Sequence, residues 1–280
     1  MSKEKIVEPQ YIFSPLNNYM INYKVYYMSL GEKVLSFLVT LIIGGAVGLV
    51  FYGDLFKVEG EPTTATHISN VVVFIGVGLL AAKIFIPAIT AKLKEQRDKK
   101  LQKQFLDFLE TLLVSLTAGN TVNDSFINAE RDLQNQYSEG EMIVRELMEI
   151  TTGLSNGKTL EEMLISFGDR SNNEDILNFS NVMSNCYRLG GDFKDVVRKT
   201  SDIINDKIAV AQEIETKISS NKLQLNAMTL MPIALVAMLK MSSPSFAENL
   251  SSFLGVLVTT VAIGIFVASY FWGQKIVDIR

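Results

Sequence analysis

The sequence is poor in the residues from which metal sites, disulfides and many catalytic centres are built. Its 280 residues include one cysteine, Cys186, one histidine, His67, and one tryptophan. A single cysteine excludes an intrachain disulfide, and one cysteine with one histidine cannot form a His/Cys zinc site. Cys-His and Ser-His-Asp catalytic arrangements also lack the partners they need. We therefore expect no metal, no cofactor and no catalytic residue, and we expect that the protein is not an enzyme.

A phosphate-binding loop is missing as well, although one segment is similar to it. Such a loop has a glycine, four further residues and then Gly-Lys-Thr or Gly-Lys-Ser. Here Gly153 stands one residue too close to Gly157, Lys158 and Thr159. The residues before it also read as a helix and not as the buried strand that the motif requires. The segment therefore favours a turn between two helices over a nucleotide site.

Long apolar runs are what the sequence has in abundance. Each run is about 20 residues long, enough for a helix to cross a hydrocarbon layer about 30 Å thick. In the first run, Gly44 and Gly48 form a G-x-x-x-G pattern that allows two helices to pack closely in a membrane. We expect four transmembrane helices, at about 34–52, 70–90, 223–241 and 252–272.

Basic residues indicate how these helices are oriented. A cluster that we call the basic neck follows the second run, whereas the loop 53–68 has one lysine and the loop 242–251 has no lysine or arginine. Because basic residues favour the cytoplasmic side, both loops are expected outside and both termini inside the cell (inner) membrane. The basic neck consists of Lys92, Lys94, Arg97, Lys99, Lys100 and Lys103.

The first 33 residues are expected to form an arm that is cytoplasmic or lies at the membrane interface. Its tyrosines recur at helical spacing, which is typical of a short interfacial helix with its rings at headgroup level. An ordinary solvated arm is the alternative. We expect no cleavable signal peptide, because the first apolar run starts late and no small-residue cleavage pattern follows it. The residues in question are Tyr19, Tyr23, Tyr26, Tyr27 and Leu30.

Residues 91–222 are expected to form one cytoplasmic domain of about six helices. Apolar residues recur there at the i, i+3, i+4 spacing of amphipathic helices, without the alternation of a half-buried strand. The last helix should continue from about residue 193 into the third membrane run, because no glycine or proline interrupts it. The fold class is therefore all-α: two membrane hairpins, 34–90 and 223–273, flank this domain, and a cytoplasmic tail, 274–280, follows.

Glycines divide the domain into helical hairpins. Each glycine turn is followed by a Thr or Asp, and a carboxylate stands three residues later, close to capping-box spacing. Glycine tolerates the left-handed conformation that ends one helix, and the Thr or Asp oxygen caps the next. The expected turn residues are Gly119 with Thr121, Gly157 with Thr159, and Gly190 with Gly191 and Asp192.

Charge divides the segment into two regions. The neck, 92–103, has six basic and two acidic residues, a net charge of +4, which suits anionic lipid headgroups. Residues 104–222 have 20 acidic and 11 basic residues, a net charge of −9. This acidic surface is either an ordinary solvated helical surface or a docking surface for a basic protein partner. Nucleic acid is not expected as a partner.

The ordered set of patterns resembles a known family. Leu116, Ala118 and Gly119, then Leu154, Gly157 and Leu160, then Gly190, Gly191 and Asp192, all between two pairs of membrane runs, are similar to the type II secretion F-domain family. The likeness is greatest to the single-domain platform proteins of tight-adherence (Flp-type) pilus systems. Arg170 matches a basic position that the family places between its second and third hairpins. The family's frequent Leu-Pro-Asp is replaced by Phe105, Leu106 and Asp107.

The resemblance implies a non-catalytic platform at the base of a pilus or secretion machine. Its expected partners are a cytoplasmic hexameric secretion ATPase, pilin subunits, membrane lipids, and a paralogous platform protein or further copies of this chain. A regulated small transporter or channel subunit is the alternative. That alternative needs polar groups along a solute path, and the spans supply little beyond Lys83, Asn226 and Lys240.

Overall fold

The computed structural model describes residues 8–55, 63–189 and 191–277, and it is helical apart from one small hairpin of strands. Four helices are long and apolar enough to cross a membrane: α1 (Leu30–Tyr52), α2 (Thr64–Thr117), α7 (Phe193–Ser242) and α9 (Phe253–Val277). These confirm the all-α fold class and the four expected membrane helices. The chain is therefore a multi-pass membrane protein.

Two compact units are distinguished by their internal contacts. One consists of Met1–Tyr27 with Thr90–Ala211, and the other of Met28–Ile89 with Gln212–Arg280. We call the first the helical domain and the second the membrane unit. The helices α2 and α7 each contribute residues to both units.

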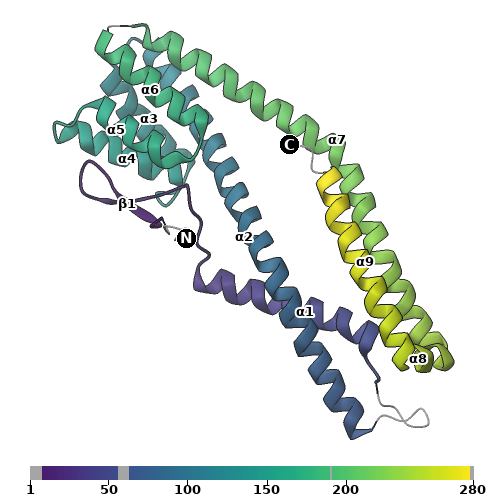
Figure 1. The fold of residues 1–280 in the computed structure, drawn as a ribbon. Helices are drawn as coiled ribbons and strands as arrows, with labels where there is room; N and C mark the ends of the chain where they lie inside the picture. Colours follow the sequence, from purple (N-terminus) through teal and green to yellow (C-terminus); the bar gives the residue numbers. More distant parts are fainter. Residues whose placement is uncertain (1–7, 56–62, 190, 278–280) are drawn as a thin grey trace, which may run out of the picture. The chain divides into compact units, whose positions relative to one another are not determined.

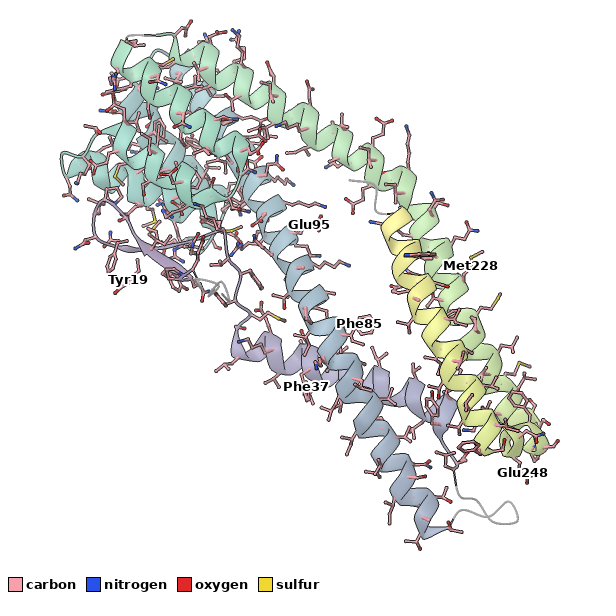
Figure 2. All side chains as sticks on the ribbon, viewed as in Figure 1. Tyr19, Phe37, Phe85, Glu95, Met228 and Glu248 are labelled. Atoms are coloured by element: carbon pink, nitrogen blue, oxygen red, sulfur yellow. The ribbon has the colours of Figure 1, made fainter. Side chains whose placement is uncertain are left out.

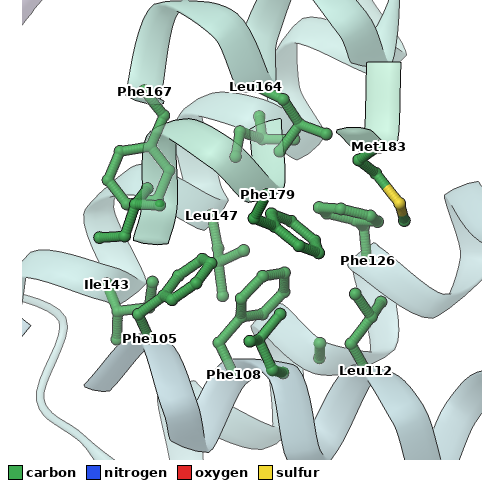
Figure 3. Close-up of a cluster of buried hydrophobic side chains, with 14 of the residues drawn as sticks. Phe105, Phe108, Leu112, Phe126, Ile143, Leu147, Leu164, Phe167, Phe179 and Met183 are labelled. Carbon is green, nitrogen blue, oxygen red and sulfur yellow. The ribbon is translucent and has the colours of Figure 1, made fainter. Parts of the chain in front are cut away.

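Four shorter helices complete the helical domain around the last part of α2 (Figure 1). They are α3 (Val122–Gln136), α4 (Met142–Ser155), α5 (Leu160–Ser171) and α6 (Glu174–Leu189). Figure 3 shows their shared core, in which Phe105 packs edge-on against both Phe167 and Phe179. The start of α7 joins this core through Val197 and Ile204, both fully buried.

The N-terminal arm differs from the short interfacial helix that the tyrosine spacing predicted. It forms a two-stranded antiparallel hairpin of β1 (Tyr11–Phe13) and β2 (Tyr19–Ile21). Irregular chain follows up to Ser29, which begins α1 with a capping box to Glu32. The prediction of a helix was wrong because side chains of the arm pack against the helices of the same unit: Tyr23 is a fully buried member of their core. The spacing of residues within the arm does not reveal which other parts of the chain will bury them.

A second difference concerns the expected outer loop 242–251. This segment contains a short helix, α8 (Pro244–Ser251), which starts with proline in its first turn after the cap Ser243. Proline lacks an amide hydrogen that the first turn would leave unpaired, so it starts a helix without penalty. Part of the other expected outer loop, 53–68, lies outside the described residues.

Candidate functional site

Two of the expected hairpin turns have the backbone conformation that favours glycine. Gly119 has φ +89° between α2 and α3, and Gly157 has φ +79° between α4 and α5. After each glycine a threonine caps the next helix: Thr121 accepts from the amide of Asp124, and Thr159 accepts from the amide of Glu162. Local sequence therefore accounts for both turns.

The third turn is built differently in the part that the structure describes. Gly190 lies outside the described residues. Gly191 does not have a positive φ, and its amide donates to the carbonyl oxygen of Cys186 at 3.0 Å. Asp192 supplies the expected cap, since its Oδ1 accepts from the amide of Asp195 at 3.1 Å.

Inside the helical domain, Glu146 of α4 and Arg170 of α5 form a buried ion pair. Arg170 Nη1 donates to Glu146 Oε1 at 2.9 Å, and Nη2 donates to Oε2 at 2.6 Å. The hydroxyl of Tyr23 donates to the same Oε1 at 3.0 Å. Burial and the neighbouring Glu146 raise the pKa of Tyr23 well above its ordinary value, so the phenol stays neutral. The carboxylate thus binds both a hairpin helix and the N-terminal arm.

The strand hairpin of the arm is attached to α4 one turn further on. Glu149 accepts from the Ser14 hydroxyl at 2.5 Å and from the Asn18 side-chain amide at 3.0 Å. Ser14 Oγ also accepts from the amides of Leu16 and Asn18, which closes the turn. Buried carboxylates need such partners, because an unpaired buried charge is costly. Sequence reasoning missed this attachment, since nothing local to residues 14–18 indicates Glu149.

Arg97, which the sequence places in the basic neck, is a third attachment point for the arm. Its guanidinium donates to the carbonyl oxygens of Tyr23 at 2.6 Å and Val25 at 3.1 Å. It also lies over the rings of Tyr23 and Tyr26, 5.5 and 5.2 Å from their centroids. Arg97 is therefore half-buried under the arm, where a solvated, lipid-facing position was expected.

The remaining neck residues have more open positions. Lys92, Lys99, Lys100 and Lys103 are exposed and Lys94 is half-buried. Lys99 pairs with Glu95 on the same helix at 3.2 Å. Lys100 reaches the start of α4, where it pairs with Glu141 at 2.8 Å. Hydrogen bonds from Lys100 and then Gln104 lower the pKa of Glu141.

In the membrane unit, the glycine pattern of α1 lies against α2. A Cβ added at Gly44 would stand 2.5 Å from the Cβ of Ala81, and one added at Gly48 would stand 2.9 Å from the Cβ of Val77. Both distances are shorter than real Cβ contacts, so glycine is what allows these helices to approach.

Lys240 of α7 binds the end of α1 within the same unit. Its ammonium donates to the carbonyl oxygens of Leu49, Val50 and Gly53 at 2.8–3.4 Å and lies 3.7 Å from Asp54. The Leu49 carbonyl also accepts from the amide of Gly53, and carbonyls at a helix C-terminus favour a cation. This contact gives Lys240 a structural role, which weakens the transporter alternative.

Metal chemistry has no candidate among the residues that the structure describes. No group of three or more His, Cys, Asp or Glu residues in that part of the chain could hold an ion. Two buried carboxylates in the described part of the chain have partners: Glu146 is bound by Arg170 and Tyr23, and Glu149 by Ser14 and Asn18.

A comparison with known protein families finds a match for the region that contains α3 to α6. Residues 108–240 match the family model described as Type II secretion system (T2SS), protein F. The match begins in α2, includes α3 to α6 and ends in α7. The comparisons with curated proteins and with solved structures find no match. The family consists of non-enzymatic membrane proteins, in keeping with the expectation that the chain is not an enzyme. The chain contains a type II secretion system protein F domain.

Proposed function

We propose that the protein is a platform protein in the cell (inner) membrane. It would serve an assembly machine for a type IV pilus of the tight-adherence (Flp-type) kind or for type II secretion. The observation that carries the proposal is the F-domain match over residues 108–240, in a chain with four candidate membrane helices. The tight-adherence assignment rests on the resemblance of a single helical-hairpin domain to the platform proteins of those systems.

The proposed topology has the helical domain and both termini in the cytoplasm. It is supported by the basic residues after the second span and by their scarcity in the loops 53–68 and 242–251. A cysteine-accessibility experiment tests it in intact cells. In a Cys186→Ser background, a cysteine at Ser245 should react with a membrane-impermeant maleimide, and one at Glu139 should react only after the cells are opened. The reverse pattern would contradict the topology.

In this proposal the domain contacts a cytoplasmic hexameric secretion ATPase, and the membrane unit guides pilin subunits into the fibre. The net charge of −9 over residues 104–222 suits a basic docking surface on the partner. The helix α7 leads without a break from the domain core at Val197 and Ile204 into the third candidate span. It is therefore suited to carry a partner's movement to the membrane.

Cross-linking in native membranes tests the proposed partners. A tagged protein is gently cross-linked, purified in mild detergent and analysed by mass spectrometry. Recovery of a secretion ATPase, with pilin or a paralogous platform subunit, is the expected result. A matched variant neutralises two exposed acidic residues of α3, Asp124→Asn with Asp132→Asn. Less ATPase and the same amount of membrane partners should be recovered with this variant. A stable complex with transporter subunits instead would contradict the proposal.

A further inference from the structure

The two faces of the N-terminal strand hairpin have different surroundings. On one face of the hairpin, Met20 is buried and its cross-strand partner Ile12 is half-buried. Because strand side chains alternate, Tyr11, Phe13 and Tyr19 share the other face with Ile21, which packs against the core of the domain. They are 45%, 55% and 66% exposed, and the rings of Phe13 and Tyr19 lie 4.5 Å apart. We call these three residues the aromatic face.

The hairpin is held near the end of the domain that continues into the membrane. Arg97 binds the carbonyls of Tyr23 and Val25, directly after β2. It is seven residues past Thr90, where the apolar run of α2 ends, which is about 10 Å along a helix. The polar layer on each side of a bilayer is about 5–8 Å thick. Measured along α2, the attachment point therefore lies just beyond the width of the polar layer, and Figure 2 shows Tyr19 at the same end of the domain as Glu95.

The residues around the hairpin have the chemistry of a membrane interface. Tyrosine and other aromatic rings favour the headgroup level, and lysines near the surface are attracted to anionic lipids. Lys24 and Lys92 are both exposed on this part of the domain. The arm is also close in sequence to the first candidate membrane helix, because only Met28 and Ser29 separate it from α1. This supports a position of the arm near the membrane.

We propose that the aromatic face of Tyr11, Phe13 and Tyr19 inserts into the lipid interface of the cytoplasmic leaflet, with Lys24 and Lys92 attracting anionic headgroups. The hairpin then fixes the helical domain to the bilayer surface at a second place beside its two helical connections. Tyr23, which the sequence pattern placed in the same interface, is instead the buried anchor. The choice of the cytoplasmic leaflet rests on the proposed topology, whereas the insertion itself is independent of which assembly machine the protein serves.

Lipid quenching tests this insertion with the full-length protein in nanodiscs. Trp272 is replaced by phenylalanine, and one tryptophan is introduced as Phe13→Trp. Interfacial side chains lie about 5–10 Å deep, within reach of lipids brominated near the headgroup. In such lipids the fluorescence of the introduced tryptophan should therefore fall by about half. Tyr187→Trp in the same background is the control, since Tyr187 is also exposed but lies on α6, close to the α6–α7 turn. Its emission should not change.

The proposal is overturned if the emission of the Phe13→Trp variant is quenched no more than that of the Tyr187→Trp variant. A variant whose arm has detached is recognised by hydrogen exchange, because the Tyr23 amide donates to the carbonyl of Arg170 at 2.9 Å and should be protected. If Phe13→Trp loses that protection, Tyr11→Trp replaces it as the probe. Stronger quenching in anionic than in zwitterionic nanodiscs supports the role of Lys24 and Lys92, and equal quenching rejects that part.

Discussion

The guanidinium of Arg170 and the carboxylate of Glu146 face each other through two hydrogen bonds inside the helical domain, with 5% and 1% of their side chains exposed. Arg170 also donates to the carbonyl of Ile21, and Glu146 accepts from Tyr23. One ion pair thus joins two hairpin helices and the N-terminal arm. In water-excluded surroundings, the loss of either charge leaves the other unpaired.

Replacing one partner of this pair should therefore destabilise the domain strongly. For Arg170→Met we expect a loss of about 3–5 kcal/mol, because Glu146 would remain buried and charged. The double variant Arg170→Met with Glu146→Met should lose less than the sum of the single losses. Thermal unfolding in detergent measures this, with the exposed neighbour Arg145→Met as the control. If the loss of stability in the double variant equals the sum of the two single losses, the two residues are not coupled.

The left-handed glycines should be sensitive to alanine although there is space for a methyl group. An added Cβ at Gly119 or Gly157 would meet no atom within 4 Å, so the cost comes only from the positive φ. We expect Gly157→Ala to destabilise by about 1–2 kcal/mol, and Gly157→Asn by less. Gly140 has equal space and no positive φ, so Gly140→Ala should be close to neutral. Equal stabilities of the two alanine variants would refute the backbone explanation.

Packing of α1 on α2 should depend on the glycine that brings them together. Gly44→Val should destabilise the membrane unit by about 1–3 kcal/mol, because its side chain would overlap Ala81. The matched control is Gly264→Val on α9, where an added Cβ meets nothing within 4 Å. Thermal stability in lipid nanodiscs distinguishes the two variants. A stable Gly44→Val protein would mean that the contact is dispensable.

The link between Lys100 and Glu141 should make stability depend on pH in the acidic range. Hydrogen bonds from Lys100 and Gln104 lower the folded-state pKa of Glu141 below its unfolded value. Its contribution is therefore present above the ordinary carboxyl pKa and is lost as the pH falls through the lowered value. At neutral pH, Glu141→Gln should cost roughly 0.2–1 kcal/mol, typical of a partly exposed pair.

The difference between wild type and Glu141→Gln should then shrink as the pH is lowered below about 4. Thermal unfolding at several pH values measures it, and the exposed neighbour Glu139→Gln serves as the control. A constant difference across the acidic range would show that Glu141 acts through something other than its charge.

Short-range patterns and composition predicted much of the molecule. The four membrane helices follow from runs of apolar residues about as long as a bilayer is thick. The turns at Gly119 and Gly157 follow from glycine with a threonine two residues later, because both the left-handed φ and the cap are local properties. The break between α6 and α7 was also predicted, although Gly191 is not left-handed.

Only the tertiary structure decided where the arm lies. The spacing of Tyr19, Tyr23, Tyr26 and Tyr27 is that of a helix, yet hydrogen bonds to Glu146 and Glu149, more than a hundred residues away, hold the arm as strands and irregular chain. From the sequence alone, Arg97 is predicted to face lipid like the other bases of the neck. In the structure it instead donates to the carbonyls of Tyr23 and Val25. A sequence pattern records which residues share a face of one element. It does not record which distant partner covers that face, because such contacts form only when the whole domain has folded.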